Sequence, residues 1–113
     1  MNLVKNNLLH SAAHITGGGL VYNLIRSVPE NLCLNLDFAK IKTKNIFKWI
    51  KSNNISDKEM LKTFNCGVGF CLVAKKKNIK KIKKYFSKKY MPYEIGYISR
   101  SKNRINVYNN IKW

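Results

Sequence analysis

The sequence predicts an α+β fold in which helices pack on a β-sheet within one domain. Segments whose apolar residues recur at helical spacing are interspersed with short segments that alternate or are apolar throughout. The chain has 113 residues, 45% of them hydrophobic, which is enough for one modest core. No apolar run reaches the roughly 18 residues of a membrane-spanning helix, and no signal peptide or membrane partner is expected.

The first third of the chain predicts two helices and a strand. Residues 1–13 place leucines at roughly helical spacing and are expected to form a helix end or an ordered lead-in. Residues 20–28 carry an apolar residue at every fourth position, and Pro29 ends this helix. Residues 32–38 alternate leucine with other residues, which is the period of a β-strand.

Two helices and a second strand are predicted next. Thr43 is the expected N-cap of a helix whose packing face is Ile46, Phe47, Trp49 and Ile50. Ser56 and Glu59 have the spacing of a capping box, in which each side chain satisfies a free N–H at the start of a helix. The apolar run 67–74 between glycines and lysines predicts a buried strand.

The last third begins with a lysine-rich helix at 78–90. Its apolar side consists of Ile79, Ile82, Tyr85, Phe86 and Tyr90. Two interpretations fit this pattern: a solvated lysine face above a core-facing stripe, or a basic surface for nucleic acid or a membrane. Two short strands at 93–99 and 104–108, joined by a turn, complete the predicted fold.

The net charge of +17 is the strongest compositional signal. Of the 22 basic residues 19 are lysine, and the chain also holds 15 asparagines and 12 isoleucines. These three types are favoured by A/T-rich codons, whereas arginine, the better phosphate-recognition residue, is scarce. We therefore attribute most of the charge to composition and do not expect nucleic acid as the main partner. Cys33, Cys66 and Cys71 lack metal-ligand spacing and are expected to be buried free thiols in a reducing cytoplasm.

The stretch AHITGGG contains half of the six glycines of the chain. Gly17, Gly18 and Gly19 precede a predicted helix, where free backbone N–H groups attract phosphate or carboxylate. His14 and Thr16 supply two further donors beside them. The alternative interpretation is a plain helix entrance without a ligand.

A second motif, TFNCGVG, follows the helix that starts near Ser56. Asn65 before a glycine fits a helix C-cap, and Gly67 and Gly69 fit close packing between a strand and a loop. The functional alternative is that these three residues form part of a cleft wall.

Several segments in this order and spacing resemble the C-terminal domain of aminoimidazole ribonucleotide synthetase, also called phosphoribosylformylglycinamidine cyclo-ligase. They are HITGGGLVYNLIRSVP, IFKWI, EMLKTFNCGVGF and YEIGYI, which together span most of the chain. The resemblance implies a three-layer α/β/α sandwich, incomplete here at its N-terminal side. It also implies a cytoplasmic homodimer that uses ATP and Mg²⁺ to close the imidazole ring of formylglycinamidine ribonucleotide in purine biosynthesis.

The resemblance also implies roles for the residues of the two motifs. The three glycines and Thr16 would bind a substrate or transferring phosphate, and His14 is a candidate catalytic residue that donates to phosphate or orients the loop. Arg26 would pair with a phosphate or a carboxylate, although a structural ion pair fits equally well.

The family's N-terminal ATP-binding domain is expected to be absent from residues 1–113, which would be a partial C-terminal domain. The five acidic residues are scattered, so no metal site and no cofactor binding by this chain alone is expected. We therefore expect catalysis only with the missing domain or a second chain that supplies it. Two alternatives are a fragment of a related ATP-dependent amidotransferase and a basic nucleic-acid-binding module.

Overall fold

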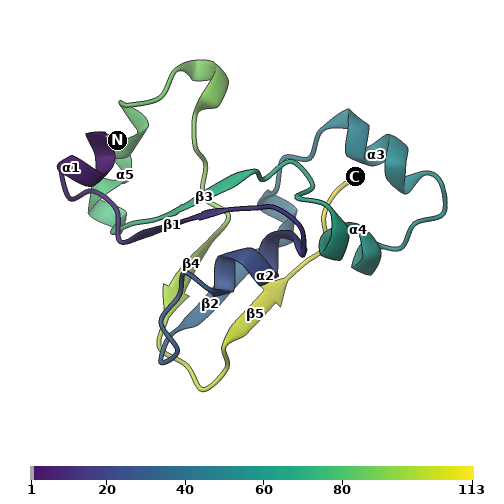
Figure 1. The fold of residues 1–113 in the computed structure, drawn as a ribbon, viewed down its shortest axis with the longest axis horizontal. Helices are drawn as coiled ribbons and strands as arrows, with labels where there is room; N and C mark the ends of the chain where they lie inside the picture. Colours follow the sequence, from purple (N-terminus) through teal and green to yellow (C-terminus); the bar gives the residue numbers. More distant parts are fainter. Residues whose placement is uncertain (1) are drawn as a thin grey trace.

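A computed structural model describes residues 2–113 and shows an α+β fold (Figure 1). The helices are α1 (Asn2–Lys5), α2 (Gly19–Ile25), α3 (Asn45–Lys51), α4 (Asp57–Thr63) and α5 (Ile79–Lys83). The strands are β1 (Ser11–His14), β2 (Cys33–Asp37), β3 (Phe70–Val73), β4 (Gly96–Ser99) and β5 (Ile105–Tyr108). None of the helices in this described part is long and apolar enough to cross a membrane.

The strands form two separate sheets. β1 and β3 pair antiparallel as a two-stranded ribbon, with His14 opposite Phe70 and Ser11 opposite Val73. The other sheet has the order β4-β2-β5, so β2 lies between the last two strands of the chain. β2 runs antiparallel to β4 and parallel to β5.

Helix α2 joins the two sheets into one core (Figure 1). Its buried residues Leu20 and Leu24 belong to the same apolar cluster as Ala13 of the ribbon and Leu34 and Leu36 of β2. Since its neighbours on both sides are apolar, this short helix is stabilised mainly by burial rather than by its own hydrogen bonds. The glycine loop at its N-terminus is thereby anchored to the centre of the molecule.

A second, smaller core lies where α1 meets α5. Leu3, Leu8 and Ile82 are buried together, and Phe86 packs against them. Figure 1 shows α1 and α5 side by side at the end of the ribbon remote from α3 and α4.

Several predicted elements differ from the structure. Ser11–His14 forms a strand although the sequence predicts a helix end or an ordered lead-in for residues 1–13, because pairing with β3 overrides the local leucine spacing. The helix predicted for 78–90 spans only Ile79–Lys83, and 88–90 forms a separate 3-10 turn. Tyr85 and Tyr90 are consequently exposed rather than packed in the core.

Helix α3 also departs from its prediction at two points. Its N-cap is Lys44, and the Thr43 hydroxyl is buried without a hydrogen-bond partner in the described chain. Only Phe47 and Ile50 of the predicted packing face reach the core, whereas Ile46 and Trp49 are more than half exposed. Only the Ser56 half of the predicted capping box is confirmed, since its hydroxyl accepts a hydrogen bond from the Glu59 N–H at 3.2 Å, whereas the Glu59 carboxylate accepts the Thr63 hydroxyl.

Candidate functional site

The three glycines of the loop differ in their structural roles. Gly18 has φ +96°, and a Cβ there would lie 2.6 Å from the Tyr22 ring. Gly19 has φ +82°, and a Cβ there would overlap the backbone carbonyl of Leu61 in α4. A Cβ at Gly17 would meet nothing within 4 Å. The fold therefore explains Gly18 and Gly19, and leaves Gly17 as the glycine with open space in front of its backbone.

Asn23 of α2 holds the shape of the loop. Its side-chain nitrogen lies 2.7 Å from the carbonyl oxygen of Gly19, and 3.2 Å from those of Thr16 and Gly17. Asn23 is 3% exposed and the Gly19 carbonyl is buried with it, so no water could replace the amide there. The carbonyls of the loop are thus held by hydrogen bonds to a side chain of α2.

Arg26 supports this arrangement from the end of α2. Its Nη2 donates to the Oδ1 of Asn23 at 2.8 Å, and its guanidinium lies 4.9 Å from the centre of the Tyr22 ring. These two contacts fix the orientation of the Asn23 amide, because the oxygen is occupied and the nitrogen must face the loop. Arg26 makes no ion pair with any residue that the structure describes.

The second motif forms a tight turn between α4 and β3. The Oδ1 of Asn65 accepts the Gly67 N–H at 2.9 Å, and the Asn65 carbonyl accepts the Val68 N–H at 3.0 Å. Gly67 has φ +101° and packs against the backbone at Lys42. The helix C-cap is Phe64 rather than Asn65. Asn65 therefore shapes the turn through its side chain.

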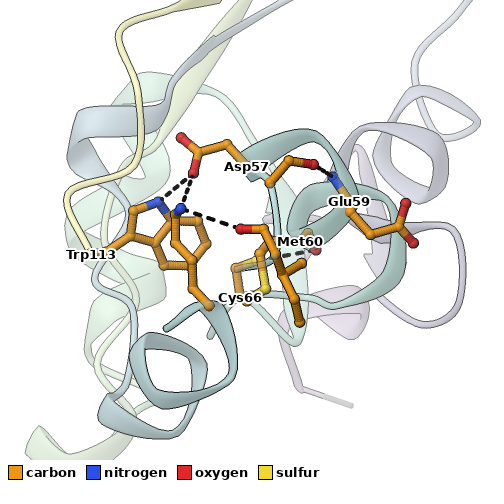
Figure 2. Close-up of polar contacts among 8 residues, drawn as sticks. Asp57, Glu59, Met60, Cys66 and Trp113 are labelled. Carbon is orange, nitrogen blue, oxygen red and sulfur yellow. Dashed lines mark hydrogen bonds and ion pairs between the residues drawn. The ribbon is translucent and has the colours of Figure 1, made fainter. Parts of the chain in front are cut away.

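Cys66 lies within this turn, and its side chain forms a hydrogen bond to the backbone of α4 (Figure 2). Its thiol donates to the Met60 carbonyl at 3.5 Å, and burial raises the pKa of the thiol to about 11. Asp57 of the same helix contributes to this rise by repulsion of the thiolate. All three cysteines are buried and free, as predicted. A thiol of such high pKa is a poor nucleophile at neutral pH.

The fold brings the two motifs together at one end of the ribbon. The Ile15 N–H donates to the Gly69 carbonyl at 2.9 Å, which extends the β1–β3 ladder into both loops. Gly19 lies against Leu61, so the beginning of α2 touches the helix that leads into the second motif. Two segments separated by about 50 residues of sequence thus form one continuous surface.

Two of the exposed side chains of this surface, those of His14 and Thr16, are ones that the sequence singled out, and Tyr22 and Phe70 are exposed beside them. His14, at the end of β1, is exposed, and its ring lies 6.1 Å from that of Phe70 on the paired strand. Thr16 is also exposed, and its hydroxyl has no hydrogen-bond partner among residues 2–113. Three hydrogen-bond donors thus occur between sequence positions 14 and 17: the His14 imidazole, the Thr16 hydroxyl and the Gly17 backbone N–H. All three can donate to an anion.

The acidic residues do not gather at this surface. Asp57 pairs with Lys51 at 3.0 Å, and Glu59 accepts the Thr63 hydroxyl at 2.7 Å. No group of three or more His, Cys, Asp or Glu residues that could hold a metal ion occurs in the described range. Within the described residues, the site offers hydrogen-bond donors and no carboxylate, so it suits phosphate and does not fit a Mg²⁺ ion.

Two structurally important residues carry no role in the sequence prediction. Asn23 lies on the helix face that packs against the core, and a polar residue at such a position is the signal by which the sequence could have identified it. Arg104 donates to four carbonyls at the end of α2 and in the following loop. No local pattern reveals that contact, since Arg104 is more than 70 residues away in sequence.

Comparison with known proteins identifies one family and several relatives that match most of the chain. Residues 1–107 match the family described as AIR synthase related protein, C-terminal domain. The phosphoribosylformylglycinamidine cyclo-ligase of Xylella fastidiosa strain 9a5c is 47% identical over 70 residues, which cover 61% of this chain and 20% of that protein. The bifunctional purine biosynthetic protein ADE5,7 of Saccharomyces cerevisiae is 39% identical over 80 residues, covering 70% of this chain and 10% of that protein. The chain therefore spans about a fifth or less of the length of these curated relatives.

Proposed function

The chain belongs to the AIR synthase related C-terminal domain family, and from this premise we propose that it forms part of a phosphoribosylformylglycinamidine cyclo-ligase. In this reaction ATP phosphorylates the amide oxygen of formylglycinamidine ribonucleotide. The neighbouring amine then attacks the activated carbon, a proton is lost and phosphate leaves. The products are aminoimidazole ribonucleotide, ADP and phosphate, within purine biosynthesis.

The observation that carries this proposal is the joining of the glycine loop to the second motif through the Ile15–Gly69 hydrogen bond. The resulting surface offers the Gly17 backbone, the Thr16 hydroxyl and the His14 imidazole to a phosphate of the substrate or to the transferring phosphoryl group. Gly18 and Gly19 shape this loop, and Arg26 acts on it through Asn23. Donors held in place before the reaction stabilise developing negative charge without reorganisation.

We propose that the ATP-binding part of the enzyme is supplied outside these 113 residues. The acidic side chains at hand are scattered or engaged, so Mg²⁺ and the phosphates of ATP would be held elsewhere. The three-layer α/β/α sandwich, the homodimer and a cytoplasmic location are parts of the same proposal, and their support is the family resemblance. Asn65, Gly67 and Gly69 would form the wall of the cleft beside the loop.

The test is reconstitution of ring closure. The chain is co-expressed with the preceding, ATP-binding portion of the Xylella fastidiosa relative, and ATP-dependent formation of aminoimidazole ribonucleotide is measured. We expect activity from the pair and none from either part alone. Co-purification of a folded pair without turnover would contradict the proposal.

Gly17→Ala is the variant that tests the loop itself. A methyl group at Gly17 has free space in the fold but would stand between the backbone and a bound phosphate. We expect an activity loss of about tenfold or more in the reconstituted pair, with an unchanged melting temperature. Lys102→Ala, a change in an exposed turn, is the matched control and should leave the rate unchanged.

A further inference from the structure

A lysine-lined hollow lies at the end of the β1–β3 ribbon opposite to the glycine loop. It consists of two adjoining depressions of about 290 and 440 Å³ that share Asn6, Leu8 and Lys81. One wall is the turn between α1 and β1, including His10, and the other runs from the end of β3 into α5. We name it the lysine hollow after Lys75, Lys77, Lys81 and Lys84.

The charge of the lysine hollow is not compensated by the protein. No aspartate or glutamate lines either depression. The one ion pair found in residues 2–113 joins Lys51 to Asp57, and neither residue belongs to the hollow. The ammonium groups of lysines that line one hollow repel one another, and salt weakens this repulsion. An anion in the hollow would relieve it.

The hollow is built on an ordered base. Leu3, Leu8 and Ile82 are buried beneath it as the smaller core. The His10 N–H donates to the Val73 carbonyl at 2.8 Å. The Asn6 amide donates to the Tyr85 hydroxyl at 2.7 Å and so ties the two walls together. The lysines therefore project from a supported surface and not from a flexible tail.

The shape and the donors indicate the class of ligand. Lysine supplies point charges that suit phosphate, and the amides of Asn7 and Asn78 add neutral donors. The two walls converge on a space close to the lower end of the range for small-molecule sites. An extended polymer would instead require a continuous groove with several stacking aromatic residues. Within the described structure, Tyr85 and the imidazole of His10 are the aromatic rings that line the hollow.

We propose that the lysine hollow binds a compact polyphosphate anion, at a second site separate from the glycine loop. The ligand class is a small molecule with two or more adjacent phosphate groups. The two sites lie at opposite ends of the ribbon, so this proposal does not depend on the proposed ring-closing activity.

The test measures binding of inorganic tripolyphosphate to the chain by calorimetry at about 50 mM salt. Lys81→Gln/Lys84→Gln removes two lysines of the hollow, and Lys48→Gln/Lys58→Gln removes two exposed lysines of α3 and α4. Both pairs lower the net charge equally. We expect about tenfold or more weaker binding for the first pair and less than about a twofold change for the second. Melting curves without ligand verify that each variant folds.

Two results would overturn the proposal. Equal weakening by both pairs would show diffuse attraction to a basic protein. A single-stranded oligonucleotide of matched charge that binds more tightly than tripolyphosphate, regardless of Lys81 and Lys84, would show an extended nucleic-acid surface instead.

Discussion

At the scale of single residues, Gly19 and Gly17 differ in the reason for which a glycine is required. Close packing in the fold requires Gly19, whereas in our proposal a bound phosphate requires Gly17. Gly19→Ala places a methyl group into the Leu61 carbonyl at a positive φ. We expect it to lower the free energy of unfolding by about 3 kcal/mol. Gly17→Ala should change it by less than about 0.5 kcal/mol. Urea-induced unfolding of both variants measures the difference, and equal losses would contradict the assignment of close packing to Gly19.

Asn23 is the residue on which the loop conformation depends. Asn23→Ala leaves the carbonyls of Thr16, Gly17 and Gly19 without their shared donor, and the Gly19 carbonyl is buried. We expect a loss of about 2–3 kcal/mol in unfolding free energy. Asn23→Asp keeps the size but removes the donor and should be at least as damaging. If Asn23→Asp were instead as stable as the natural chain, the amide would not be the group that holds the loop.

The buried thiols make stability fall at alkaline pH. Burial raises the pKa of both Cys66 and Cys71 from 9.0 to about 11. The folded state therefore retains these protons more firmly than the unfolded chain. Their stabilising contribution is complete below about pH 9 and is lost as the pH rises through about 11.

Lysines lose their charge in the same pH range, so the thiol effect is isolated by comparison with Cys71→Ala. Between pH 8 and 11 we expect the unfolding free energy of the natural chain to fall more than that of the variant, by on the order of 2 kcal/mol. Thermal unfolding followed across this range provides the measurement. Parallel curves would mean that Cys71 titrates alike in both states.

At the scale of elements, Arg104 fastens the end of α2 to the beginning of β5. Its Nη1 lies 2.6 and 2.7 Å from the carbonyls of Pro29 and Leu32, and its Nη2 lies 3.0 and 3.3 Å from those of Val28 and Ile25. A cation at a helix C-terminus also complements the helix dipole. One side chain thus joins the last residue of α2 and three carbonyls of the loop that follows it.

Arg104→Met keeps the aliphatic stem of this side chain and removes its donors. We expect it to cost about 2 kcal/mol in unfolding free energy, because four carbonyls lose a charged partner. Arg100→Met, in the exposed turn just before, is the control and should be neutral. Chemical denaturation of the two variants decides the matter, and equal effects would contradict the fastening role.

Side-chain contacts also join α3 and α4 to the end of the described chain (Figure 2). Asp57 accepts the Trp113 indole N–H at 3.0 Å and pairs with Lys51 at 3.0 Å. Lys51 also lies 5.7 Å from the centre of the Trp113 ring. These partly exposed contacts hold α4, and hence the turn at Cys66, against the rest of the molecule.

At the scale of the whole molecule, the chain is somewhat expanded and flat. Its radius of gyration is 14.5 Å, whereas a compact chain of this length has about 13 Å. The shortest dimension is 22 Å and the longest 45 Å. This shape follows from two unequal cores, the main one around α2 and the smaller one beneath the lysine hollow.

The two cores should differ in local stability. The smaller core has three buried residues and carries the uncompensated lysines, so it opens at a lower free energy than the main core. We expect amide hydrogens of α5 to exchange at least about tenfold faster than those of β2, which is paired on both sides. Hydrogen exchange followed by mass spectrometry tests this, and uniform exchange would indicate a single cooperative unit.

The sequence by itself determined the family, the α+β class, the strand at Cys33–Asp37 and the Ser56 cap of α4. These features depend on motifs, periodicity and capping over a few neighbouring residues. Only the tertiary structure decided that Ser11–His14 is a strand, that β2 lies between β4 and β5, and that Gly17 is the one glycine of the AHITGGG loop with open space. The physical reason is range: strand pairing, the Gly19–Leu61 approach and the Arg104 hydrogen bonds join residues about 40 to 80 positions apart, where local patterns carry no information.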